Sequence, residues 1–343
     1  MEFWSPVTGV LGAALVILIS YDLFRTVLTV SGGGPVAAQM AAVAWRLSLR
    51  VAAGRCHPPR WLAAVGPALA VLTLLVWLAG LWSGWTMIFS ASPDAVVEAQ
   101  SKAPASLVDR LYYVGYTLTT LGLGDFQPAP GGWRVATVLA AANGLFLFTM
   151  AITYIVPIVA ATAAQRQLAT IIDALGDDPA DILARSWHDG GFDMLESHLV
   201  TLMPMIAAIR EQHLAYPILH FFHSGEREAA MPVQLAVLDE ALTLLAHGVE
   251  PAARPAPQTL GPLRAQLEGF LATLESAWIE PIRPAPPPPA LGRCAEAGIP
   301  MRDAGAFAVA LDAEAERRAC LHGLVRSDGW HWSHVGGADG AGT

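Results

Sequence analysis

Charged residues are scarce in this sequence. Only 14% of its 343 residues are Asp, Glu, Lys or Arg, whereas 54% are hydrophobic. Soluble domains usually carry about 25% charged residues, so the composition indicates a membrane protein with a soluble part. The apolar residues concentrate in the first half, and the second half holds most of the acids, prolines and histidines. That asymmetry predicts two structural units.

Cysteine is nearly missing as well. Cys56, Cys294 and Cys320 fit neither a disulfide framework nor a paired Cys-x-x-Cys metal motif, and we expect free thiols in the cytosol. The net charge of −9, without any dense Lys/Arg run, argues against nucleic acid as a partner.

Catalytic and nucleotide-binding motifs are missing too. The chain has no Gly-x-Ser-x-Gly elbow, no His-Glu-x-x-His pair and no Gly-x-Gly-x-x-Gly after a strand-like run. These absences predict that the chain is not an enzyme and uses no organic cofactor. They also predict that it lacks a nucleotide-binding regulatory domain.

One short motif stands between two long uncharged runs. Residues Leu107–Pro128 read LVDRLYYVGYTLTTLGLGDFQP, and the uncharged runs are Trp61–Pro93 and Val135–Gln165. A Thr-x-Gly-x-Gly turn between two membrane spans suits a potassium filter, which replaces the ion's hydration shell with rings of backbone carbonyls. For carbonyls to point inward in succession, some residues must leave the usual backbone regions. Gly122 and Gly124 do so at little steric cost.

The motif T-T-L-G-L-G-D-F-Q-P, residues 119–128, resembles the T-T-V-G-Y-G-D-x-x-P signature of the potassium channel pore-loop family. Leu121 stands where the family has valine. Leu123 replaces a tyrosine whose hydroxyl usually braces the filter against the pore helix. The resemblance covers residues 61–164, under a third of the chain.

The resemblance implies a role for each part of the motif. Backbone carbonyls of the filter, together with the Thr120 hydroxyl, would coordinate dehydrated K⁺ ions in consecutive sites. The ion-binding residues would be Thr120, Leu121, Gly122, Leu123 and Gly124. The residues that support the filter would be Thr119, Asp125, Tyr112, Tyr113 and Tyr116.

Charge and hydropathy, together with what the resemblance implies for residues 61–164, predict the following domains. Residues 1–30 form an N-terminal transmembrane helix, 31–60 a cytoplasmic linker with an amphipathic interfacial helix, 61–164 the pore domain (outer helix, pore helix, filter and inner helix), 165–335 a helical cytoplasmic domain and 336–343 a disordered tail. Asp22 and Arg25 lie three residues apart in the first helix, so we expect them to pair.

The linker sets the orientation. It holds Arg46, Arg50, Arg55 and Arg60 and no acid, so the positive-inside rule places it in the cytoplasm. The N-terminus then lies outside the cell membrane and the C-terminus in the cytoplasm, the orientation that a pore loop entering from outside requires. These arginines are not spaced every third residue in a membrane helix, so they do not form a voltage sensor.

The inner helix contains two candidate gating residues. Gly144 lies twenty residues after Gly124, where many relatives have a hinge, and Pro157 removes a backbone donor near the cytoplasmic end. A helix-packing role for Gly144 is an equal alternative.

The second half reads as helical, with proline-rich linkers at 251–262 and 281–289. His213, His220 and His223 follow one another at helical spacing, interrupted by Pro217. They are candidates for metal binding or pH sensing, and a packed interior set is the alternative.

These observations predict an all-α membrane protein with a potassium channel pore domain, an extra N-terminal span and a helical cytoplasmic domain. Because each chain supplies one pore loop and a filter needs four, we expect a homotetramer in the membrane lipid, opened by an unknown cytoplasmic ligand or partner. Two alternatives remain. One is a weakly selective cation channel, and the other is a membrane-tethered signalling or scaffold protein with a vestigial pore.

Overall fold

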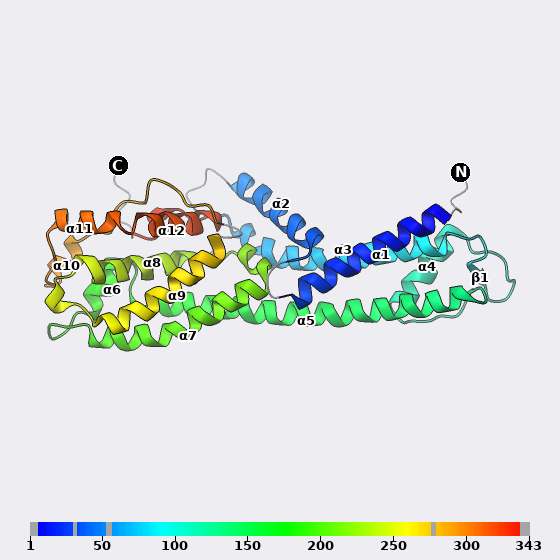
Figure 1. The fold of residues 1–343 in the computed structure, drawn as a ribbon, viewed down its shortest axis with the longest axis horizontal. Helices are drawn as coiled ribbons and strands as arrows, with labels where there is room; N and C mark the ends of the chain where they lie inside the picture. The colour runs from blue at the N-terminus through cyan, green and yellow to red at the C-terminus, as the bar shows by residue number, and fades with distance from the viewer. Residues whose placement is uncertain (1–5, 30–32, 53–56, 276–278, 337–343) are drawn as a thin grey trace. The chain divides into compact units, whose positions relative to one another are not determined.

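The computed structural model describes residues 6–29, 33–52, 57–275 and 279–336 of the chain. Its contacts divide the chain into two compact units (Figure 1). The first unit comprises Met1–Val43 and Ala68–Ile158, and the second comprises Ala44–Pro67 and Val159–Thr343.

Three helices are long and apolar enough to cross a membrane. They are α1 (Pro6–Leu28), α3 (Val65–Phe89, preceded by the 3-10 turn η1, Arg60–Ala64) and α5 (Gly132–Leu175). The predicted spans thus form as helices. The expected pore domain, with its inner helix, ends at residue 164, whereas α5 continues to Leu175. The span and residues 167–175 thus belong to one helix of 44 residues.

Small residues bring α1 and α3 together within the first unit (Figure 1). A Cβ atom added at Gly12 would lie 2.5 Å from the carbonyl oxygen of Gly84, and one added at Gly84 would lie 2.8 Å from Val16. Such close backbone approach is typical of helices that pack inside a membrane, where glycine gives van der Waals contact that larger residues prevent.

Asp22, buried in α1, caps a different helix. Its carboxylate accepts hydrogen bonds from the backbone N–H groups of Val36 (2.7 Å) and Ala37 (3.3 Å), in the first turn of α2 (Pro35–Ala52), and from Trp77 Nε1 (2.7 Å) in α3. A carboxylate at a helix N-terminus satisfies orphan N–H groups and interacts favourably with the helix dipole. Asp22 therefore fixes where α2 begins.

The expected pairing of Asp22 with Arg25 is wrong. Arg25 donates to the Tyr21 hydroxyl at 2.9 Å, and no ion pair joins it to Asp22 in the described residues. The N–H groups in the first turn of α2 have no partner within their own helix, so they compete with Arg25 for the Asp22 carboxylate. They prevail because a buried charge is best compensated by several donors at once.

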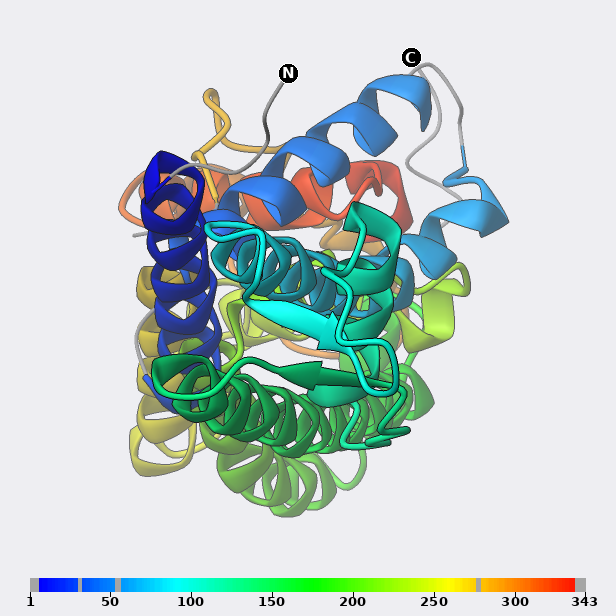
Figure 2. The same cartoon turned by 90° about the vertical axis from the view of Figure 1, so that its right-hand side faces the viewer.

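Two short strands pair with each other in the segment between α3 and α5. β1 (Val96–Glu98) pairs antiparallel with β2 (Phe126–Pro128), with Val97 opposite Gln127 (Figure 2). Helix α4 (Leu107–Leu118) and the loop after it lie between them in sequence. The sequence indicates only a polar linker before α4, because three residues are too few to show strand alternation.

The second unit is a helical bundle. After the end of α5, its helices are α6 (Pro179–Ser186), α7 (Asp193–Ala215), α8 (Met231–Thr243), α9 (Pro257–Glu275), α10 (Gly292–Glu296), α11 (Ala304–Asp312) and α12 (Ala315–Ser327). Every residue of α8 is buried, so it is the central helix of this core. Short turns join the helices, among them the 3-10 turns η2 (Pro217–Phe221), η3 (Arg227–Ala229), η5 (Pro251–Ala253) and η6 (Trp332–His334), and the π turn η4 (Leu244–Gly248).

Prolines break this bundle less often than expected. Pro204 lies inside α7, and α9 begins at Pro257, within the expected linker 251–262. Proline is tolerated in the first turn of a helix because the N–H that it lacks has no partner there. Of the expected disordered tail, residues 337–343 lie outside the described residues.

A buried arginine holds the proline-rich segment 281–289 against the bundle. Arg318 of α12 forms two hydrogen bonds with the Glu240 carboxylate of α8, at 2.7 and 2.9 Å. It also donates to the carbonyl oxygens of Pro286 (3.0 Å) and Pro287 (2.7 Å). One guanidinium thus joins two helices and the segment.

Candidate functional site

Helix α4 begins and ends at well-defined caps. Ser106 Oγ accepts a hydrogen bond from the N–H of Asp109 (3.3 Å), and Asp109 Oδ2 accepts one from the N–H of Ser106 (3.0 Å), which forms a capping box. At the other end, the N–H of Thr119 donates to Gly115 O at 3.1 Å. Both ends of α4 are therefore fixed, and the loop that follows starts at a defined place.

The loop after α4 has an alternating backbone. Thr120, Gly122 and Gly124 have positive φ angles of 58°, 58° and 84°, and they alternate with Leu121 and Leu123. The expectation that the two glycines leave the usual backbone region is met. Thr120 was not foreseen, because a non-glycine residue rarely adopts this conformation, and when it does the strain is often found at a functional site.

The carbonyl oxygens of residues 120–124 accept no hydrogen bond from any described residue. The N–H groups at the start of the loop, in contrast, are paired: Leu121 N–H donates to Tyr116 O at 2.8 Å, and Thr120 N–H to Thr117 O at 3.1 Å. The side chains of Leu121 and Leu123 are 64% and 53% exposed. A row of unpaired carbonyls in an exposed, strained loop is suited to bind a cation.

The tyrosines of α4 contact the residue that follows the loop and the two neighbouring spans. Tyr116 Oη donates to Phe126 O at 2.7 Å, just after the loop, and the Tyr112 ring packs edge-on against Phe126. Tyr113 forms a 2.5 Å hydrogen bond with Thr137 of α5 and packs against Phe89 of α3. The Tyr116 side chain thus links α4 to the start of β2, and a role for these tyrosines in supporting a filter stays a prediction.

The other two support residues make local contacts. Thr119 Oγ1 donates back to Gly115 O at 2.9 Å, and Asp125 Oδ1 accepts from the N–H of Phe126 at 3.1 Å. Thr119 therefore extends the cap of α4, and Asp125 stabilises the turn into β2.

Arg110 is a positioning residue that the sequence did not reveal. Its side chain is fully buried, although it is charged. It donates to Ala105 O (3.0 Å) and Ser92 O (2.9 Å), and also to the carbonyls of Phe89 and Pro93. It satisfies carbonyls at the C-terminus of α3. A lone arginine within the apolar run of α4 was the available signal.

Gly144 lies where α5 meets the end of α4. A Cβ atom at Gly144 would fall well inside 3.0 Å of the Leu118 carbonyl oxygen, a distance that real Cβ atoms do not reach. Helix α5 is continuous through Gly144 and Pro157. The contact supports the packing alternative for Gly144, and the gating roles of both residues stay predictions.

The three candidate histidines engage different partners. His213 Nδ1 donates to Ile209 O at 3.0 Å, and its Nε2 lies 3.4 Å from the Gln165 amide nitrogen. Because an amide nitrogen can only donate, His213 Nε2 accepts and the ring is neutral. His223 Nδ1 donates to the Asp328 carboxylate at 3.1 Å. The His220 ring packs against Phe221. Within the described part of the chain, none of the three belongs to a group of metal-ligating side chains.

Burial keeps two of these rings uncharged near neutral pH. It lowers the pKa of His213 to about 4 and, with a smaller effect from His213, that of His220 to about 3. Burial also raises the pKa of the Asp328 carboxyl, against the effect of His223. A sensing role for this set stays a prediction.

Acidification should destabilise the second unit through His213. Its pKa falls from 6.5 to about 4 on folding, so between these values the unfolded chain binds a proton that the folded chain does not. The free energy of unfolding should then fall by up to about 1.4 kcal/mol per pH unit from this group. Thermal unfolding from pH 7.5 to 4.5 should show a shallower loss of stability in His213→Gln. His198→Gln, at an exposed site, should keep the wild-type slope, and equal slopes in all three proteins would contradict the assignment.

Comparison with known proteins gives two findings. A family model described as "Ion channel" matches residues 72–161, from α3 through most of α5. The uncharacterized membrane protein YdjJ of Bacillus subtilis (strain 168) is 33% identical to the chain over 310 residues, which is 90% of each chain. No solved structure matches the chain significantly.

Proposed function

This chain belongs to the ion-channel family and is a multi-pass membrane protein, and from that premise we propose that it conducts potassium ions passively through residues 120–124. The family is not enzymatic. The observation that carries the proposal is the row of unpaired carbonyls at residues 120–124, in a loop whose φ angles alternate. Such carbonyls replace the water around a dehydrated K⁺ ion.

The proposed filter needs four chains. One loop offers carbonyls on one side of an ion only, and four loops around an axis surround it. The exposure of Leu121 and Leu123 supports this assembly, because exposed apolar side chains in a loop are expected at an interface. We therefore propose a homotetramer in the cell membrane, with the N-terminus outside and the second unit in the cytoplasm.

The proposed mechanism combines ion binding and gating. K⁺ ions occupy consecutive carbonyl sites, with the Thr120 hydroxyl at the inner end, and repulsion between neighbouring ions lets them leave. Helix α5, with Gly144 and Pro157 as gating candidates, carries movement of the cytoplasmic helices to the pore. Leu123 lacks the bracing hydroxyl of the family tyrosine, which favours weak cation selectivity as the second candidate function.

Thr120→Ala should reduce potassium selectivity. In purified protein reconstituted into bilayers, wild-type current under a K⁺/Na⁺ gradient should reverse near the K⁺ equilibrium potential. Loss of one ligand ring should lower the permeability ratio roughly tenfold, which corresponds to about 1.4 kcal/mol. Thr170→Ala is the control, because its hydroxyl bonds to Arg166 O, outside the proposed pore domain.

Two outcomes would decide against the selective channel. Wild-type current that reverses near zero would identify a weakly selective pore. If no current is seen, thermal stability distinguishes a closed channel from a vestigial one, because a filter that binds K⁺ raises the melting temperature in K⁺ relative to Na⁺. Equal melting temperatures in the two salts would show that residues 120–124 do not bind K⁺ in preference to Na⁺, which is the result expected for a vestigial pore.

A further inference from the structure

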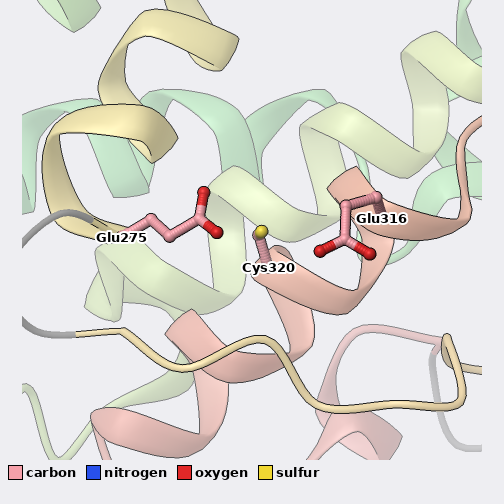
Figure 3. Close-up of side chains that lie close together, drawn as sticks. All are labelled: Glu275, Glu316 and Cys320. Carbon is pink, nitrogen blue, oxygen red and sulfur yellow. The ribbon is translucent and has the colours of Figure 1, made fainter.

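Three metal-ligating side chains meet in the second unit, far in sequence from the proposed filter. Glu275 is the last residue of α9, and Glu316 and Cys320 lie one turn apart on α12. Their ligand atoms all lie within 4.8 Å of one another. Figure 3 shows the sulfur between the two carboxylates, with Glu275 on one side and Glu316 on the other.

The thiol in this cluster is buried and directed at the carboxylates. Cys320 is only 5% exposed, it is not in a disulfide, and its sulfur has no hydrogen-bond partner outside the cluster among the described residues. Burial, followed by the nearby Glu275 and Glu316, raises the pKa of the thiol to about 11. Burial beside two carboxylates disfavours the negatively charged thiolate form of Cys320, and a cation bound among the three side chains would remove that penalty.

The charges of the cluster are only partly compensated. Arg283 binds the Glu316 carboxylate, with Nε 3.1 Å from Oε2. Glu275 has no ion-pair partner among the described residues. It also ends α9, where the helix dipole disfavours a negative charge. A cation placed between the three side chains would relieve both effects.

We propose that Glu275, Glu316 and Cys320 bind a divalent transition-metal ion of the zinc class. One thiolate and two carboxylates are donors that Zn²⁺ accepts, with water in the fourth position, and a thiolate disfavours Mg²⁺ and Ca²⁺. In a tetrahedral site, the sulfur and oxygen ligands lie about 3.6 Å apart, given bonds of about 2.3 and 2.1 Å. Both glutamates are exposed, so their side chains can close the remaining distance.

Metal binding changes the neighbouring contacts in a defined way. The thiol releases its proton on coordination. The ion then competes with Arg283 for Glu316, which frees the guanidinium at the start of segment 281–289. Arg318 still holds that segment at Pro286 and Pro287. The site therefore links metal availability to one end of the proline-rich segment.

Spectroscopy of the full-length protein in detergent tests the thiolate ligand. Added Co²⁺ or Cd²⁺ should produce a sulfur-to-metal charge-transfer band in the wild type. The band should be lost in Cys320→Ser, whereas Cys294→Ser and Cys56→Ser should retain it. Cys294 is a suitable control because it is also buried and not in a disulfide. Circular dichroism shows whether each variant is folded.

Titration calorimetry tests the carboxylates and the competing arginine. Zn²⁺ binding should release about one proton per ion, and Glu275→Gln should weaken it. Arg283→Gln should tighten it several-fold, because the competitor for Glu316 is gone. A charge-transfer band that survives in Cys320→Ser, no band in the wild type, or weaker binding in Arg283→Gln would each overturn the proposal. None of these readouts depends on ion conduction.

Discussion

Replacing Gly144 with alanine should abolish conduction and destabilise the first unit. The added Cβ would overlap the backbone carbonyl of Leu118, an atom that cannot rotate away. Because Leu118 is the last residue of α4, the strain would displace the start of residues 120–124. Overpacking of this kind costs about 1–3 kcal/mol even where side chains can shift, and the close contact with backbone places Gly144 at the upper end.

The sign of the stability change separates packing from hinge bending. If Gly144 only gave α5 flexibility, alanine would stabilise the helix by about 1 kcal/mol through its higher helix propensity. Melting temperature and single-channel recording should therefore be measured together. Gly132→Ala is the matched control, because a Cβ there meets no atom within 4 Å. A Gly144→Ala protein that is more stable than wild type would contradict the packing account.

Replacing Arg318 with methionine should destabilise the second unit by about 3–5 kcal/mol, the usual cost of removing one partner of a buried ion pair. The Glu240 carboxylate would lose both of its hydrogen bonds to the guanidinium, and two carbonyls of segment 281–289 would lose their donor. Thermal or urea unfolding in a chelating buffer measures the loss.

Two comparisons test this explanation. Arg283→Gln removes a similar bond to Glu316, but both of those side chains are mostly exposed, so it should change stability by less than about 1 kcal/mol. Burial raises the pKa of the Glu240 carboxyl even beside Arg318, so the variant should lose less stability at lower pH, where that carboxyl is neutral. Equal effects of the two arginine substitutions would contradict a burial-dependent pair.

The sequence predicts local features well because their causes are local. Uncharged runs long enough to cross a membrane indicate α3 and α5 directly. In the motif, Gly122 and Gly124 occupy positions that need positive φ, and that requirement can be recognised from the residue type alone.

Features that depend on distant partners could not be predicted. Asp22 is bonded by Val36 and Trp77, 14 and 55 residues away, whereas helical spacing indicated only its neighbour Arg25. Glu275 and Cys320 are on different helices, and no motif spacing joins them. In each case the tertiary fold, rather than the local sequence, brings the groups together.

The pairing of β1 with β2 closes the segment between them into one loop. Glu98 lies opposite Phe126, so the chain that contains α4 and residues 120–124 starts and ends at the same place. Within these fixed ends, Arg110, Tyr113 and Leu118 join α4 to α3 and α5, so a change in the path of either span is transmitted directly to residues 120–124.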